Sequence, residues 1–224
     1  MSIKSNFSAV THKISVSAAA VGTNPQLVAV TKTVSSDVIE ELYALGQRHF
    51  GENRADAISA KHDVLNERYP DIVWHFIGSL QTRKVKDILP FVSYIHSLDR
   101  LSLAKEISKR ADRVIDCFIE VNVSGEDSKH GLVPEDVVSF IEKLQEYQNI
   151  NIIGLMTMAP FTSNDDELKN VFSNLKTIQE DVIKQNFEWA PCTELSMGMS
   201  NDYPIAISAG ATFVRVGTEL VTEI

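Results

Sequence analysis

The chain has 224 residues, of which 44% are hydrophobic and 23% are charged, the balance of an ordinary soluble globular protein. Its formal net charge of −9 argues against a nucleic-acid-binding surface, and no apolar run is long enough to cross a bilayer. The two cysteines, Cys117 and Cys192, lack the spacing of a disulfide framework or a zinc site, so a cytoplasmic location fits.

In chain order, residues 1–22 lack the apolar core of a secretory signal and are expected to form a leading helix. Short β-rich runs follow, at residues 27–31, 48–50, 73–77, 92–96, 114–123, 150–155, 193–195 and 212–216. Amphipathic segments lie between them, at residues 36–45, 54–67, 100–111, 134–147 and 165–184, with a short helix expected at 203–209. Strand and helix therefore alternate throughout. The basic cluster at residues 83–86 is interpreted as a solvated helix face rather than a phosphate site.

Eight alternating units in a chain of this length favour a closed, TIM-type (β/α)8 barrel over an open doubly wound sheet. The glycine patterns GxGxxG after a first strand and GxxxxGK[ST], which mark dinucleotide and nucleotide sites on open sheets, are absent from the sequence. No linker or repeat interrupts the pattern. We expect one domain over residues 1–224.

In such a barrel the loops after the strands meet at one rim, so residues just beyond a strand are candidates for a site. Lys32 ends the apolar run 27–31. A lysine there can lose its charge to the low dielectric beneath it, which is the condition for attack on an aldehyde to form a Schiff base. An ordinary solvated lysine is the alternative. Other polar residues that follow predicted strands are Glu52, Asn53, Ser79, Gln81, Ser97, Asn122, Ser124 and Thr157.

Two turns near the end of the sequence could bind phosphate. After the seventh predicted strand, Ser200 is expected to cap the helix at 203–209, where backbone N–H groups favour an anion. After the eighth, Gly217 allows close approach to the backbone, beside the Thr218 hydroxyl. In barrels of this type, a phosphate site is frequently formed by the loops after the seventh and eighth strands. A merely capped helix and another phosphorylated metabolite remain alternatives, but Lys32 favours pyridoxal phosphate.

Arg215 alternates with Val214 and Val216, which would direct its side chain into the barrel mouth. A guanidinium cannot accept a proton, so an arginine beside a pyridine nitrogen would leave that nitrogen unprotonated and make the ring a poor electron sink. The alternative is an arginine paired with Glu219 or another carboxylate at the rim.

Ordered motifs from about residue 27 to 218 resemble the pyridoxal phosphate homeostasis protein family. They are Ala-Val-Thr-Lys-Thr at 29–33, Phe-Gly-Glu-Asn at 50–53, Trp-His-Phe-Ile-Gly-Ser-Leu-Gln at 74–81, Ile-His-Ser-Leu-Asp at 95–99, Val-Asn-Val-Ser-Gly-Glu at 121–126 followed by Ser128, Lys129 and Gly131, Gly-Leu-Met-Thr-Met at 154–158, Ser-Met-Gly-Met-Ser at 196–200 and Arg-Val-Gly-Thr at 215–218. A protein of this family resembles the barrel domain of alanine racemase as a separate protein.

The resemblance implies a pyridoxal 5'-phosphate-binding protein that acts in intracellular supply and control of this cofactor, without an established turnover reaction. It implies a Schiff base on Lys32, phosphate contacts from Ser200, Gly217 and Thr218, a cofactor contact from Asn53, and Arg215 near the pyridine nitrogen. Three positions depart from the family pattern: Arg54 replaces a common tyrosine, Arg83 replaces a common asparagine, and the ending at residues 222–224 is short and acidic.

The enzyme alternative is an amino-acid racemase, which would need a second positioned acid or base and usually a covering domain. His75, His96 and Tyr203 are the residues it would recruit, although a histidine beside an apolar strand is more often a structural, hydrogen-bonded residue. The histidines show no metal-ligand spacing, so metal hydrolysis is not indicated. We expect a monomer that binds pyridoxal phosphate and makes transient contact with apo-enzymes that depend on it.

Overall fold

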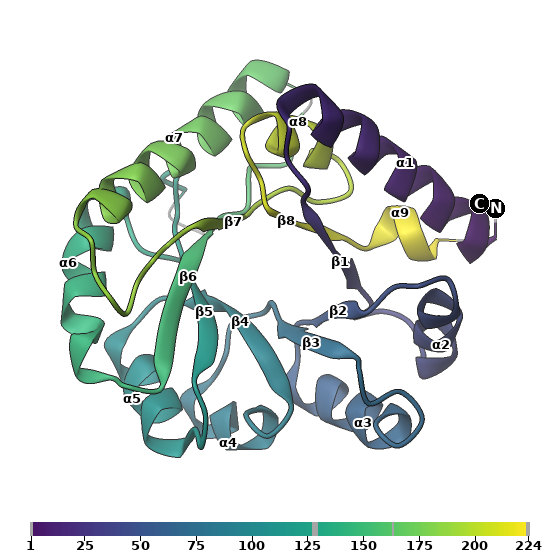
Figure 1. Cartoon of the computed structure of the whole chain (residues 1–224), viewed down its shortest axis with the longest axis horizontal. Helices are drawn as coiled ribbons and strands as arrows, with labels where there is room; N and C mark the ends of the chain where they lie inside the picture. The colour runs from purple at the N-terminus through teal and green to yellow at the C-terminus, as the bar shows by residue number, and fades with distance from the viewer. Residues whose placement is uncertain (1, 127–129, 163, 223–224) are drawn as a thin grey trace.

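The computed structural model describes residues 2–126, 130–162 and 164–222, and in these ranges eight parallel strands close into a barrel in the order of the sequence (Figure 1). Ser128, Lys129 and the last two residues lie outside the described ranges. The strands are β1 (Gln26–Val30), β2 (His49–Glu52), β3 (Val73–Phe76), β4 (Val92–Leu98), β5 (Ile115–Glu120), β6 (Ile150–Met156), β7 (Glu194–Ser196) and β8 (Phe213–Val216). The predicted (β/α)8 barrel is confirmed.

Strand boundaries differ most from the prediction at β5, which ends at Glu120 rather than at residue 123. Val121 makes an isolated bridge to Leu132, and the side chain of Asn122 then closes a turn. Its Oδ1 accepts from the amide of Gly125 at 3.1 Å, and its Nδ2 donates to a backbone carbonyl at 2.9 Å. The apolar alternation of this segment therefore continues beyond the point where an asparagine turn ends the strand. Similarly, Ser97 lies within β4 and Glu52 within β2 rather than after them.

Helices surround the barrel (Figure 1). They are α1 (Ile3–Val21), α2 (Ser36–Ala44), α3 (Ala55–Leu65), α4 (Val85–Ile88), α5 (Leu101–Arg110), α6 (Val137–Lys143), α7 (Asp165–Lys184), α8 (Tyr203–Ser208) and α9 (Thr218–Val221). The segment predicted as one helix at 134–147 consists of α6 between the short 3₁₀ turns Pro134–Asp136 and Leu144–Glu146. In the basic cluster, Arg83 and Lys86 are exposed while Val85 is buried, which confirms the solvated helix face.

The leading helix α1 is fixed at both ends and against the end of the chain. The Ser2 hydroxyl accepts from the amide of Ser5 at 3.2 Å, and Gly22 ends the helix with a φ of 70°. The Asn6 side chain donates to the carbonyls of Leu220 and Thr222 at 3.2 and 3.0 Å. Helix α1 consequently lies beside α8 and α9, where it covers the barrel outside β8 and β1 (Figure 1).

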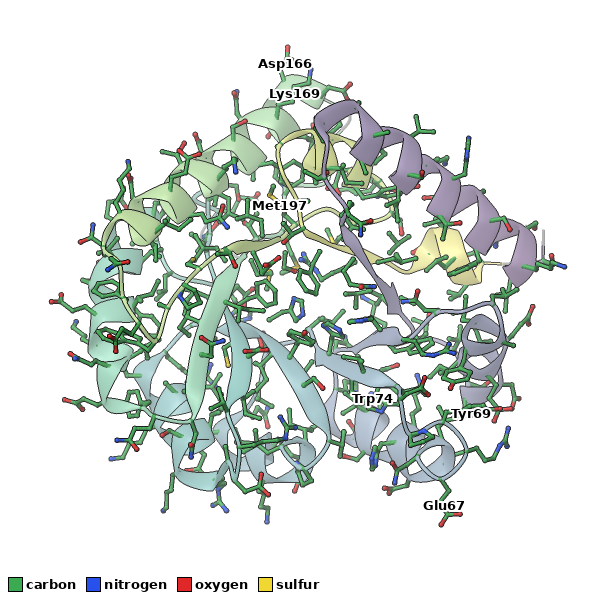
Figure 2. All side chains as sticks on the ribbon, in the orientation of Figure 1. Glu67, Tyr69, Trp74, Asp166, Lys169 and Met197 are labelled. Atoms are coloured by element: carbon green, nitrogen blue, oxygen red, sulfur yellow. The ribbon has the colours of Figure 1, made fainter. Side chains whose placement is uncertain are left out.

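Apolar side chains fill two layers of the molecule. The larger layer lies between strands and helices, and the smaller one lies inside the barrel, where Val28, Phe118, Met156 and Phe213 pack together. Figure 2 shows Met197 within the ring of helices, with polar side chains such as Glu67 at the outer edge. Because the barrel interior is filled, a ligand has room only at a rim.

Some features relevant to function class are also defined. In the described ranges no helix is both long and apolar enough to cross a membrane. No cluster of three or more histidine, cysteine or acidic side chains in those ranges could hold a metal ion. Both cysteines are free and buried, and burial raises the pKa of the Cys192 thiol to about 12, so it stays protonated at neutral pH.

Candidate functional site

A cavity of about 400 Å³ lies at the carboxyl-terminal ends of the strands, the rim where sites of such barrels occur. It brings together every residue that the sequence singled out for cofactor binding: Lys32, Asn53, Ser200, Arg215, Gly217 and Thr218. These residues come from the ends of β1, β2, β7 and β8. We refer to this cavity as the rim pocket.

Lys32 lines the rim pocket as the second residue after β1, and it is exposed. The buried interior of the barrel ends at Thr31, which is 0% exposed, so Lys32 lies at the edge of the low-dielectric region. The position of Lys32 is set by its neighbour. The Thr31 amide donates to Gly51 O at 3.1 Å, which continues the ladder between β1 and β2 to the edge of the pocket.

A buried ion pair holds Thr31 in place from the other side. Oε1 of Glu52 accepts from the Thr31 hydroxyl at 2.7 Å and from Nζ of Lys61 at 2.6 Å. Nζ of Lys61 also donates to Thr31 O at 2.7 Å. The Glu52 side chain is fully buried, and its Oε2 has no hydrogen-bond partner among the described residues. Helix α3 and β2 are thereby connected to the residue that precedes Lys32.

The turn after β7 differs from the expected capped helix. The N-cap of α8 is Asp202, whose carboxylate accepts from the Met199 amide at 2.5 Å, so the prediction of Ser200 as N-cap is wrong. Gly198 has a φ of 93°, and a Cβ there would lie 2.6 Å from that of Ala206, so the tight turn requires glycine.

Ser200 instead joins the two predicted phosphate turns. Its Oγ accepts from the backbone amides of Gly217 and Glu219, at 3.3 and 3.4 Å. Two backbone donors from the turn after β8 thus converge on one oxygen atom that belongs to the turn after β7. Convergent N–H groups beside a hydroxyl and an adjacent Thr218 form a donor set suited to a phosphate, so these residues fit the group.

Arg215 forms the floor of the rim pocket and is 4% exposed. Its Nη1 donates to Oγ of Ser196 at 2.6 Å, and its Nη2 donates to Thr157 O at 2.9 Å. The alternative pairing with Glu219 is wrong, because that carboxylate is bound by Lys13 at 2.5 Å. Burial lowers the pKa of the Arg215 guanidinium to about 10, and nearby acids oppose this shift, so it stays charged at neutral pH.

Glu120, at the end of β5, also lines the pocket and was missed in the sequence because the predicted strand continued past it. Burial raises the pKa of its carboxyl group, as does the nearby Asp99, whereas His130 and Arg215 lower it. The available signal is an acidic residue that directly follows the apolar residues Phe118 and Ile119. Glu120 places its carboxyl group on the side of the pocket away from β1, the strand that precedes Lys32.

Asn53 is exposed at the pocket edge, where a glycine supports it from below. A Cβ on Gly78 would lie 2.2 Å from Asn53 O, so the loop after β2 packs directly on the backbone that follows β3. Among the other residues after strands, Ser79 lines the pocket. Ser97 donates to Gly78 O at 2.5 Å and Thr157 donates to Val121 O at 2.7 Å, which assigns both of them structural contacts.

The residues that a racemase would recruit lie elsewhere. His75 and His96 are 0% exposed inside the barrel and hydrogen-bond to each other at 2.9 Å, as expected for structural histidines. Tyr203 lines a neighbouring cavity between α1 and α8, and burial raises its pKa. The rim pocket is lined by none of these three residues.

Comparison with known proteins identifies the family to which this chain belongs. The family model "Alanine racemase, N-terminal domain" matches residues 5–223. A relative from Aquifex aeolicus named pyridoxal phosphate homeostasis protein is 42% identical over 201 residues, covering 88% of this chain and 86% of the relative. A human protein of the same name is 34% identical over 210 residues, covering 89% and 76%.

Solved structures agree. PipY of Synechococcus elongatus, determined with pyridoxal phosphate bound, has a TM-score of 0.87 and 32% identity, covering 99% of this chain and all of PipY. Alanine racemase of Clostridium difficile has a TM-score of 0.77 at 13% identity, covering 99% of this chain and 56% of the racemase, which shows a shared barrel fold. The chain belongs to the pyridoxal phosphate homeostasis protein family, whose barrel is that of the alanine racemase N-terminal domain.

Proposed function

We propose that the chain binds pyridoxal 5'-phosphate in the rim pocket and serves in its intracellular storage and supply. The observation that carries the proposal is the convergence of an amine and a phosphate-type donor set on one cavity. Lys32 approaches it from β1, while Ser200 and the amide of Gly217 meet at 3.3 Å on the neighbouring side. The relatives' shared name and the PipY complex support the same cofactor.

In this proposal each residue has a separate role. Ser200, Gly217 and Thr218 would hold the phosphate, Asn53 would contact the cofactor from the loop after β2, and Arg215 would lie near the ring nitrogen. Lys32 supplies the amine that would condense with the cofactor's aldehyde, with loss of one water, and this reversible covalent bond is the chemistry that the cofactor brings. A guanidinium beside the ring nitrogen has no proton to accept, which disfavours carbanion chemistry.

We further propose that the protein has no turnover reaction of its own. A racemase needs acid and base groups on opposite faces of its substrate, and the histidines that would serve are held inside the barrel. A carrier without catalysis suits an exposed Lys32 at an open rim.

The same proposal covers the protein's state and contacts. Residues 1–224 would act as one monomeric barrel in the cytoplasm, and the rim pocket would pass its cofactor to apo-enzymes through transient contact. Barrels of this size can bury enough surface to be stable alone. Neither a membrane nor a nucleic acid has a part in it, in keeping with the net charge of −9.

An absorption titration tests the binding proposal. Purified protein mixed with pyridoxal phosphate should develop a visible band that Lys32→Ala abolishes and Lys86→Ala, an exposed lysine on α4, leaves unchanged. A band of equal intensity in Lys32→Ala would contradict the assignment. The racemase alternative is tested by chiral analysis of alanine and serine after long incubation, which should show no racemisation above the Lys32→Ala control. Racemisation above that control would favour a racemase over a binding protein.

A further inference from the structure

A continuous chain of hydrogen bonds crosses the interior of the barrel below the rim pocket. Nδ1 of His49 lies 2.9 Å from Nε2 of His75, and Nδ1 of His75 lies 2.9 Å from Nε2 of His96. Nδ1 of His96 lies 2.8 Å from Oγ of Ser196, to which Nη1 of Arg215 donates at 2.6 Å. We call His49, His75, His96 and Ser196 the histidine relay.

The relay runs from one end of the barrel to the other. His49 is the first residue of β2 and is partly exposed, whereas Ser196 is the last residue of β7. His75 and His96 lie between them and are completely buried. The relay therefore connects the amino-terminal end of the barrel, where solvent reaches His49, to the arginine under the rim pocket.

One donor pattern gives every proton of this chain of hydrogen bonds an acceptor. A guanidinium can only donate, so Oγ of Ser196 accepts from Arg215, and in this pattern the Ser196 proton goes to Nδ1 of His96. A neutral imidazole that accepts at Nδ1 carries its proton on Nε2, so His96 donates to Nδ1 of His75. By the same step His75 donates to His49.

Stacked aromatic rings hold this geometry. His75 stacks on Tyr94 with centroids 4.4 Å apart and planes 10° apart, and His96 stacks on Phe118 at 4.3 Å and 23°. Burial lowers the pKa of His75 and of His96 well below the ordinary value, with the charges of neighbouring relay members and of Arg215 adding to the effect. Both imidazoles are consequently neutral at neutral pH, as the donor pattern requires.

We propose that the histidine relay positions Arg215 under the rim pocket and transmits the protonation state of its His49 end to that guanidinium. The positioning of Arg215 and the response of the relay to protonation of His49 concern the protein without ligand. The effect on a bound cofactor rests on the function proposed above.

Protonation of His49 would reverse the relay. When His49 carries a proton on both nitrogens, its Nδ1 donates to Nε2 of His75. At equilibrium His75 and His96 are then both in the Nδ1–H tautomer, each having given up its Nε2 proton and taken one at Nδ1, so that His75 donates to His96 and His96 donates to Ser196. The relay gains one proton, and the positive charge stays on His49. The Ser196 hydroxyl then no longer donates to His96, although it still accepts from Arg215.

The groups around the relay favour His49 as the site of proton uptake. Burial lowers the pKa of His49, although His49 is less buried than the other two histidines. His75 and the ring of Tyr94, 6.4 Å away, face it, and Tyr94 in turn faces Asp116 and Glu194. At the other end, Asp202 and Glu120 are the acids that face Arg215.

Imidazole ¹⁵N chemical shifts, which distinguish the two tautomers, test the relay in the protein without ligand. At mildly alkaline pH, His49, His75 and His96 should each carry the proton on Nε2. During acid titration, His75 and His96 should change to the Nδ1–H tautomer at the midpoint at which His49 becomes doubly protonated. A His96 already protonated at Nδ1 at alkaline pH, or tautomers that stay fixed while His49 titrates, would overturn the proposal.

His49→Asn provides the matched variant. The amide oxygen of asparagine can take the place of Nδ1 and accept from His75, but it does not titrate. This variant should keep both Nε2–H tautomers and lose their change with pH. His12→Asn, at an exposed position on α1, should behave as the natural protein. Tautomers that still change at the original midpoint in His49→Asn would contradict transmission.

The loaded protein tests the link to the pocket. The visible band of bound pyridoxal phosphate should shift with pH at the His49 midpoint, and this shift should be absent in His49→Asn but present in His12→Asn. A band that is insensitive to His49 would refute the connection to the pocket. If the protein fails to bind the cofactor, the proposed function is contradicted. The histidine tautomers of the unliganded protein would still test whether the relay responds to protonation of His49.

Discussion

Oγ of Ser200 lies 3.3 Å from the amide nitrogen of Gly217, so the turns after β7 and β8 meet at a single oxygen atom. The same hydroxyl accepts from the amide of Glu219 at 3.4 Å. Both contacts are at the long end for hydrogen bonds to a neutral oxygen, and the two donors are directed at the edge of the rim pocket. A phosphate oxygen carries more charge and would be the stronger acceptor for these donors.

Ser200→Ala should therefore weaken binding of pyridoxal phosphate by about tenfold to a hundredfold, because a hydrogen bond to a charged group contributes roughly 1.5–3 kcal/mol. Binding of pyridoxal, which lacks the phosphate, should change little. Equilibrium titration of both compounds measures the difference. Ser208→Ala removes an exposed hydroxyl of α8 and serves as the control. Equal weakening for both compounds would contradict a phosphate role for Ser200.

Lys61→Met should destabilise the protein and disturb Lys32. The change leaves the buried Glu52 carboxylate without its partner at 2.6 Å, a loss that typically costs about 3–5 kcal/mol. Urea denaturation measures it, and Glu52→Gln/Lys61→Met should recover part of the loss. Because Lys61 also holds Thr31 O, the rate at which pyridoxal phosphate attaches to Lys32 should fall. An unchanged free energy of unfolding would count against a structural ion pair here.

Gly78→Ala should displace the loop that carries Asn53. The new Cβ would lie 2.2 Å from Asn53 O, and overpacking of this kind costs roughly 1–3 kcal/mol. Gly154→Ala is a matched control, because its Cβ would lie 2.0 Å from Glu194 O, away from the rim pocket. Both variants should lose thermal stability, but only Gly78→Ala should lose affinity for pyridoxal phosphate. The same affinity in both would indicate that Asn53 makes no cofactor contact.

Stability should fall on acidification because of His75 and His96. The pKa of each is lowered well below the ordinary value in the folded protein, chiefly by burial. Below about pH 6.5 the unfolded chain binds protons that the folded chain does not, so unfolding becomes easier as pH falls toward the folded-state pKa. Each histidine contributes up to about 1.4 kcal/mol per pH unit in that window.

Urea denaturation across that window measures the effect. His96→Asn should lose its share of the slope, since asparagine does not titrate, whereas His12→Asn should retain the full slope. Glu120 and Asp202, whose pKa values are raised by burial, contribute with the opposite sign and are common to all three proteins. Parallel curves for His96→Asn and the natural protein would contradict a neutral, buried His96.

Local sequence patterns were sufficient for the barrel and for the members of the rim pocket. Alternating runs give the strands, and residues just past the strands reach one rim whatever their distance in sequence. Lys32 and Arg215 could be predicted together for this reason, since β1 and β8 are neighbours in the closed sheet.

The contacts inside the site could not be predicted in the same way. His96 and Ser196 are 100 residues apart, and their hydrogen bond depends on inward-facing positions of strands on different sides of the barrel. The role of Ser200 depends on the approach of two turns, whereas its sequence context is equally that of a helix cap. Lys61 appeared to be one more charged residue on an amphipathic helix. Its partner Glu52 falls in a predicted loop, because the predicted strand ends at residue 50 whereas β2 extends to Glu52.

The most direct test of the central claim is to reduce the protein with borohydride in the presence of pyridoxal phosphate and to map the modified peptide by mass spectrometry. The account predicts one phosphopyridoxyl group, on Lys32, with no labelling in Lys32→Ala. Modification at another lysine, or an unlabelled chain, would contradict it.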